Sequence, residues 1–156
     1  MNLAETPCVR CLGLGKPDHE FIVLGALASQ NRAPTNHGPW RFAYQKARRE
    51  WVKEFRSKLD AGLVTRADGR RVVRMTRLYS GRKREWDRGN LIGGMKLVLD
   101  AMSRPRAAKQ AAKGVIDGVG LIVDDSPKWL LDVYEQERTE MICGMRFEFW
   151  NLPEAK

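Results

Sequence analysis

The alternation of apolar and polar residues along the chain predicts a small protein of mixed α and β structure. Residues 20–26 form a short apolar run of β-branched and aromatic residues, which predicts a first strand. Over residues 40–60, apolar residues recur at steps of three or four, which predicts a helix with an aromatic inner face that ends near Gly62. That face would contain Trp40, Tyr44, Ala47, Trp51, Phe55 and Leu59.

The second half of the chain predicts further strands around a second helix. Residues 66–70 contain Asp68-Gly69, the strongest hairpin-type turn signal in the chain, and residues 71–79 predict a strand whose exposed face is basic. Residues 91–102 carry the apolar stripe of a helix, with Asn90 as its expected cap. Residues 119–123 predict a short strand or strand end. Residues 129–138 and 141–150 predict two final strands that are joined tightly near Thr139.

Together these elements predict one domain of the α/β (α+β) class. Its sheet would be small and mixed, with about four to five strands and two main helices packed on it. A chain of 156 residues is long enough to bury a real core without disulfides or metals. We expect this domain to span residues 20–150, with a loose tail of residues 1–19 before it and a short tail of residues 151–156 after it.

Positive charge is concentrated in the middle of the chain. The protein has 28 Lys and Arg against 19 Asp and Glu, a formal net charge of +9. Residues 66–113 contain 14 of those basic residues and only 4 of the acidic ones. A localised positive field is typical of proteins that bind nucleic-acid phosphates. The alternative interpretation is a solvated face that is kept charged for solubility.

Apolar runs and cysteines indicate the compartment in which the protein is expected. No apolar run reaches the roughly 18 residues of a membrane span, and the N-terminus lacks the features of a signal peptide, so we expect a cytoplasmic protein with no membrane association. Three cysteines do not suggest a disulfide framework. Cys8 and Cys11 form a Cys-x-x-Cys, which is half of a zinc site, but the second half is missing. A zinc-dependent nucleic-acid adaptor and a reduced tail are the two interpretations of that motif.

Four side chains are of the types that metal-dependent phosphodiester hydrolysis requires: Asp87, Lys96, Asp124 and Asp125. Carboxylate oxygens suit Mg²⁺, and Mn²⁺ as well. Such a metal lowers the pKa of a bound water, while a nearby ammonium adds positive charge for the transition state. No Ser-His-Asp or Cys-His arrangement offers an alternative chemistry. The other interpretation of Asp124-Asp125 is a plain turn after a strand.

The order of these motifs resembles the RusA family of Holliday junction resolvases. The resemblance rests first on residues 86–102, WDRGNLIGGMKLVLDAM, and then on residues 120–126, GLIVDDS. Upstream, a Ser-x-Asn loop at residues 29–31 is followed by a basic, aromatic helix, as in the N-terminal part of that family. The resemblance extends over roughly residues 21–150, and its motifs are specific in combination rather than singly.

This resemblance implies a homodimeric, Mg²⁺-dependent endonuclease that nicks four-way DNA junctions symmetrically, in recombination, repair or phage DNA processing. The family's first carboxylate falls on Asp87, its essential lysine on Lys96, and its paired aspartates on Asp124 and Asp125, of which the second is catalytic. Asp87 and Asp125 would hold the metal with help from Asp124. Basic side chains would grip the DNA backbone. We assign this role to Arg77, Arg82, Lys83, Arg84 and Arg88.

The chain departs from the family's pattern at one important position. The typical motif reads Asp-x-Asp-Asn, and Gly89 stands where the second aspartate is expected. Either Asn90, Asp100 or water takes the place of that ligand, or metal affinity and activity are reduced. The second possibility predicts a catalytically weakened protein of the same fold that binds branched DNA without cutting it. The basic segment of residues 104–113 would be an added DNA contact.

Overall fold

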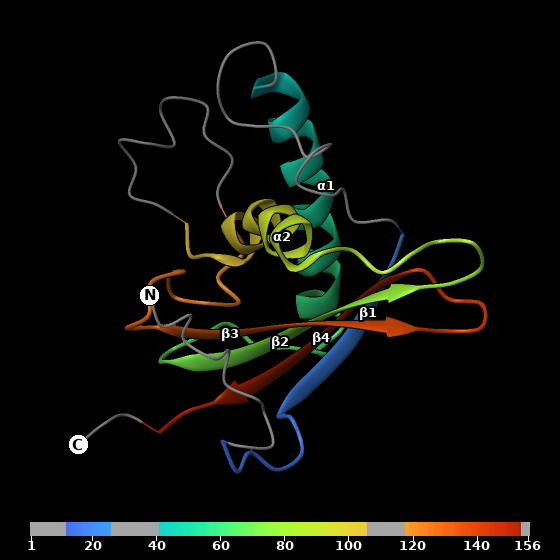
Figure 1. The fold of residues 1–156 in the computed structure, drawn as a ribbon. Coiled ribbons are helices and arrows are strands. Elements are labelled where there is room, and N and C mark those ends of the chain that lie inside the picture. Colours follow the sequence, from blue (N-terminus) through green and yellow to red (C-terminus); the bar gives the residue numbers. More distant parts are fainter. Residues whose placement is uncertain (1–11, 26–40, 106–117, 154–156) are drawn as a thin grey trace, which may run out of the picture.

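The computed structural model describes residues 12–25, 41–105 and 118–153. The elements follow in the order β1 (His19–Leu24), α1 (Arg41–Asp60), β2 (Arg71–Tyr79), α2 (Arg88–Met102), β3 (Leu130–Arg138) and β4 (Gly144–Asn151). The four strands form one mixed sheet in the order β1-β4-β2-β3 (Figure 1), which confirms the predicted α+β class. The expectations for Cys8, Cys11, the loop at residues 29–39, Trp40 and the segment 106–113 lie outside the described residues.

The position of β2 in the sheet determines which segments come together. It pairs antiparallel with β4 on one side and parallel with β3 on the other. Parallel neighbours need a long crossover connection, which α2 and the segment after it provide. The last two strands are joined by the short segment 139–143, as predicted, but they are not neighbours in the sheet, because β2 lies between them. Before β3 begins, Val119, Leu121 and Ile122 lie in the same core as α2.

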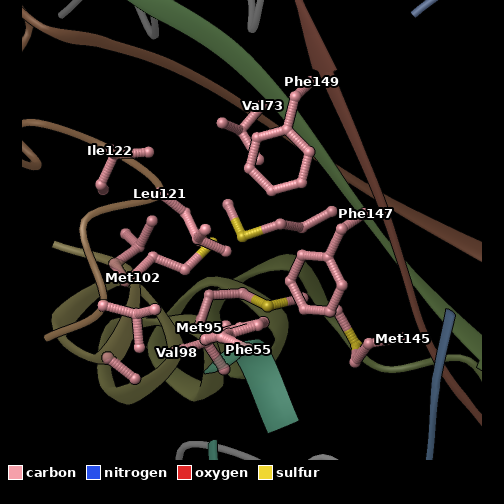
Figure 2. Close-up of a cluster of buried hydrophobic side chains, with 14 of the residues drawn as sticks. Phe55, Val73, Met95, Val98, Met102, Leu121, Ile122, Met145, Phe147 and Phe149 are labelled. Atoms are coloured by element: carbon pink, nitrogen blue, oxygen red, sulfur yellow. The ribbon is translucent and has the colours of Figure 1, made fainter. Parts of the chain in front are cut away.

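The main core lies between this face of the sheet and the two helices. Figure 2 shows Met95, Val98 and Met102 of α2 directed toward Phe147 and Phe149 of β4, and all five side chains are fully buried. Burying a side chain of this size stabilises the fold by about 1.5–3 kcal/mol relative to leaving it in water. The apolar stripe that the sequence assigned to α2 therefore does face the core.

Helix α1 follows its predicted pattern. Tyr44 and Phe55 are buried and Trp51 packs against the core, so the aromatic stripe is mainly a packing surface. Its end at Gly62 is confirmed, because this glycine has a φ of 71° and its backbone N–H donates to Leu59 O at 2.9 Å. Within the described residues, neither helix has the length and apolar character needed to cross a membrane.

The prediction of an exposed basic face on β2 is wrong. Arg71 is 1% exposed and Arg77 is 5% exposed, while Arg74 is half-buried. Arg71 and Arg77 lie on the same face of β2 as Val73 and Met75, because side chains alternate between the two faces of a strand, and this face belongs to the main core. Arg71 donates from Nη1 to Thr65 O and to Leu121 O, each at 2.8 Å, and burial lowers the pKa of its guanidinium.

Residues 119–123 do not form the predicted strand. The backbone N–H of Val119 donates to Ala101 O and that of Gly120 donates to Met102 O, both at 3.0 Å. These are carbonyls at the end of α2 that have no acceptor role inside the helix. The apolar run was correctly predicted as core, because Val119 and Leu121 are buried, but its backbone partners are helical. Similarly, Asp68 lies in a bend after α1 rather than in a hairpin.

The other face of the sheet has a smaller apolar cluster near the chain's ends. Val72, Val133 and Trp150 form this cluster. The indole N–H of Trp150 donates to Gly15 O at 2.9 Å, and Asp18 accepts a 2.7 Å hydrogen bond from a β4 backbone N–H. Residues 12–18, which we expected to belong to a loose tail, therefore contact the last strand.

Candidate active site on helix α2

Lys96 and Asp125 come together on the outer side of α2. Lys96 follows the buried Met95, and its own side chain is 71% exposed. Its Nζ atom lies 3.9 Å from Asp125 Oδ2 and 3.7 Å from Asp100 Oδ1. The predicted lysine and the predicted carboxylate of the second motif thus meet, although they are distant in the sequence. One ammonium is shared by two carboxylates from two different segments.

Helix α1 holds Asp100 in this arrangement. Asp100 is four residues after Lys96, so the two side chains share one face of α2. The Tyr44 hydroxyl donates to Asp100 Oδ2, and Arg48 Nη2 donates to the backbone oxygen of Asp100 at 3.0 Å. The Asp100 side chain is only 18% exposed. Of the two substitute ligands considered for the position of Gly89, Asp100 is therefore the one that lies beside Lys96 and Asp125.

The turn that carries Asp125 is organised by short-range contacts. Asp124 Oδ1 accepts a 3.0 Å hydrogen bond from the backbone N–H of Asp125, and both aspartates are exposed. Ser126 O accepts a 3.0 Å bond from the backbone N–H of Leu130, which begins β3. On the upstream side, Arg71 binds Leu121 O. The plain-turn interpretation of this segment is therefore correct locally, and the same turn brings Asp125 to Lys96.

Strand β3 adds two polar residues that the sequence analysis missed. The Tyr134 hydroxyl donates to Asp132 Oδ2. Burial is the main cause that raises the pKa of Tyr134, followed by this hydrogen bond and by the charges of Asp132 and Asp125. Tyr134 is thus a neutral hydrogen-bond donor that interacts electrostatically with Asp125. The sequence feature that could have revealed them is the alternation of residues in β3. It places Asp132 and Tyr134 on the same face as the buried Leu130.

Asp87 has a structural task at the start of α2. It is the N-cap: Oδ1 accepts a 2.9 Å hydrogen bond from the backbone N–H of Asn90, and Oδ2 accepts from the Asn90 side-chain amide. The first of these bonds is the main cause that lowers the pKa of Asp87. The prediction that Asn90 caps the helix is wrong, because α2 begins at Arg88 and Asn90 lies within its first turn.

The structure does not assemble Asp87 with the paired aspartates. Nine residues of helix rise separate Asp87 from Lys96, roughly 13 Å along the axis. Asp87 contacts Asn90, whereas Lys96 contacts Asp100 and Asp125. In the part of the chain that is described, no three or more His, Cys, Asp or Glu side chains group closely enough to hold a metal ion. The carboxylates of Asp100 and Asp125 are of the ligand type that Mg²⁺ prefers, and this ion also takes water and phosphate oxygens as ligands.

The segment before α2, residues 80–87, is called the basic loop below. Gln136 of β3 fixes it by accepting a 2.9 Å hydrogen bond from the backbone N–H of Trp86 and donating a 2.7 Å bond to the carbonyl of the same residue. The guanidinium of Arg77 lies 3.8 Å from the centroid of the Trp86 ring and donates to Arg84 O at 3.2 Å. The chain is therefore anchored to the sheet immediately before Asp87.

The basic residues predicted to grip DNA fall into two groups. Arg77 is buried and its guanidinium binds within the fold, so it holds the basic loop instead of facing solvent. The other four lie exposed on the basic loop and at the start of α2. They are Arg82, Lys83, Arg84 and Arg88. Only this second group is available for a phosphate backbone.

Comparison with known proteins does not extend this description. No protein-family model matches the chain, and no curated protein or solved structure matches it either. The interpretation of the site therefore depends on the contacts and chemistry given above, together with the motif order in the sequence.

Proposed function

We propose that this protein is a Mg²⁺-dependent endonuclease that nicks branched DNA, such as a four-way junction, in the manner of the RusA family. One observation carries the proposal. The Lys96 ammonium lies within 4 Å of both Asp100 and Asp125, side chains that reach it from α2 and from the turn before β3. Carboxylates beside an exposed ammonium are suited to a divalent cation and a phosphate at the same place.

Each residue has a distinct task in this proposal. Asp125 and Asp100 would hold Mg²⁺ or Mn²⁺, and Asp124 would support Asp125 through the turn. When bound, the ion supplies a water of lowered pKa and compensates the charge that builds up on the phosphate. Lys96 would leave its two carboxylates and turn toward the phosphate, which its high exposure permits. Asp87 would keep the start of α2 in place and present a carboxylate next to the entering DNA.

The DNA would lie across the basic loop. Arg82, Lys83, Arg84 and Arg88 are exposed there, and contacts of such residues to phosphates supply affinity without sequence preference. A homodimer fits this task, since two sites related by a twofold axis match two strands of a junction with similar symmetry. Sedimentation equilibrium of the free protein, in which a mass of one chain speaks against the dimer, tests that part separately.

The cleavage proposal is tested with a synthetic four-way junction in Mg²⁺ buffer. Wild-type protein should produce paired nicks on a denaturing gel, and Asp125→Asn should lose them while still shifting the junction on a native gel. Asp60→Asn is the matched control, because it changes an exposed aspartate at the end of α1. Absence of nicking by the wild type, or full nicking by Asp125→Asn, would refute the catalytic assignment.

A second candidate function is the binding of branched DNA without cleavage. Two observations favour it: Gly89 replaces the expected carboxylate, and the carboxylate of Asp87 is engaged in the helix cap instead of joining Asp125. Under this alternative, the wild-type protein shifts the junction equally with and without Mg²⁺ and leaves both strands intact.

A further inference from the structure

Three exposed apolar side chains gather at one end of the sheet. Leu24 at the end of β1 is 74% exposed, and Met141 and Ile142, in the turn between β3 and β4, are 89% and 42% exposed. We call these three residues the apolar tip. Figure 1 shows that the end of β1, the basic loop and the turn before β4 all lie at the same end of the molecule, on the right of the view.

Hydrogen bonds join the turn of the apolar tip to the basic loop and to the strand end before it. Thr139 donates its backbone N–H to Tyr79 O at 2.8 Å, and the Ser80 hydroxyl lies 3.1 Å from Cys143 Sγ. Arg138 donates to the backbone oxygens of Gly81 and Lys83 at 3.0 and 3.2 Å. On the other side, Gly25 donates to Cys143 O at 3.1 Å, which places the end of β1 beside the same turn. The tip and the loop therefore form one continuous surface.

The turn that presents Met141 is held in a fixed shape. The Thr139 hydroxyl donates to Ile142 O at 2.5 Å and accepts a 3.0 Å hydrogen bond from the Ile142 backbone N–H. These two bonds close the turn, and Met141 stands outside them with its thioether in solvent. Grouped apolar side chains in a fixed, exposed position are typical of an interaction site.

Charge indicates which partner fits this surface. Arg82, Lys83 and Arg84 are exposed on the adjoining loop, and Glu140 is the acidic residue next to Met141. An anionic partner with apolar faces satisfies both parts of the surface. DNA with unstacked bases has this chemistry, because its phosphates are anionic and its exposed base faces are apolar. Methionine, leucine and isoleucine are among the side chains that proteins insert against base steps.

We infer that the apolar tip contacts an unstacked base of the bound DNA, with Met141 as the main contact, while the basic loop holds the neighbouring phosphates. This inference rests on the proposed binding of branched DNA, but it does not depend on cleavage. It assigns the turn between β3 and β4 a role in distinguishing branched DNA from a continuous duplex, in which every base is stacked.

The experiment measures binding and base unstacking separately, in buffer without divalent metal. A fluorescein-labelled four-way junction gives affinity by anisotropy, and a junction with 2-aminopurine at the branch reports unstacking by fluorescence. We expect Met141→Ser to weaken junction binding about tenfold, which corresponds to about 1.4 kcal/mol, and to reduce the 2-aminopurine signal. Its affinity for a fully paired linear duplex should stay as in the wild type.

Two control variants test whether an apolar side chain is needed at Met141 in particular. Met141→Leu keeps an apolar side chain and should keep both signals. Leu63→Ser removes an exposed apolar residue of the segment between α1 and β2 and should change neither. Wild-type behaviour of Met141→Ser overturns the inference alone, whereas failure of the wild type to bind any junction overturns the proposed function with it. A change of oligomeric mass in Met141→Ser shows instead that the tip is a subunit interface, which also overturns the inference.

Discussion

The Gln136 side chain pairs with the backbone of Trp86 at both ends of its amide, with hydrogen bonds of 2.9 and 2.7 Å. It thereby holds the residue that precedes the N-cap of α2. We predict that Gln136→Leu lowers the free energy of unfolding by about 1–2 kcal/mol, because two backbone groups lose their partner. Urea unfolding followed by circular dichroism measures this loss. Gln45→Leu, on the half-exposed side of α1, should cost less.

Lys96 should matter for activity and hardly for stability. Its side chain is 71% exposed, so its two ion pairs contribute at most about 1 kcal/mol to folding. If it stabilises the transition state, Lys96→Met should reduce the rate of junction nicking by roughly 10²- to 10³-fold, while the unfolding transition stays nearly unchanged. Lys53→Met, on the exposed surface of α1, serves as the matched control. A Lys96→Met protein with normal nicking would remove Lys96 from the mechanism.

Asp87 can be tested by separating its cap from its charge. Asparagine caps helices as well as aspartate does, so Asp87→Asn should keep the thermal stability that Asp87→Ala loses. If the charge of Asp87 also serves cleavage, both variants should nick junctions more slowly than the wild type. Melting temperatures of both variants equal to that of the wild type would show that the cap contributes little.

The pH dependence of the same cap follows from the direction of its pKa shift. The hydrogen bond from the Asn90 backbone holds the pKa of Asp87 below its usual value. The charged cap therefore contributes fully above about pH 4, the ordinary carboxyl range, and is lost as the pH falls through the lower pKa of the folded state. Asp87→Asn should lack this component of acid destabilisation. Comparing the melting temperatures of both proteins between pH 6 and pH 2 would reveal it.

Arg71 should be among the most sensitive positions of the fold. It is 1% exposed and donates to Thr65 O, Leu121 O and Asn151 Oδ1. Arg71→Met would leave these acceptors without their donor, and we expect a loss of about 2–4 kcal/mol in unfolding free energy. The exposed neighbour Arg70 gives the control Arg70→Met, which should change stability by less than about 0.5 kcal/mol.

Salt dependence distinguishes the exposed arginines from Arg77. If Arg82 and Arg84 each neutralise a phosphate, replacing either with Ala should reduce the slope of log K against log salt by about 0.9 for duplex DNA. Arg77→Met should leave this slope unchanged and lower stability instead, because its guanidinium binds Gln136 and the carbonyl of Arg84. A reduced slope in Arg77→Met would show that it reaches the DNA after all.

Local patterns in the sequence were sufficient for the elements that depend on local interactions. The apolar spacing of residues 40–60 and 91–102 predicted both helices, which the structure begins at Arg41 and Arg88, and the strand propensity of residues 71–79 predicted β2 with its observed bounds. Periodicity works here because it records which side of a helix or strand is buried. The same patterns could not show which face of β2 the core covers, which is why Arg71 and Arg77 were expected on the surface.

In the candidate site, too, the sequence predicted the residue types, and the tertiary structure determined which of them meet. Residue type and motif order marked Asp87, Lys96, Asp124 and Asp125, but only the tertiary structure, in which β3 pairs with β2, places Asp125 of the turn before β3 beside Lys96 of α2. The tertiary structure also brought Asp100 into the site through Tyr44, whereas Asp87 is held in the helix cap by a local contact with Asn90. Sequence determines which side chains a short segment offers, because these preferences act within a few residues. Which of them meet depends on strand order and helix packing, which arise from contacts between residues far apart in the chain.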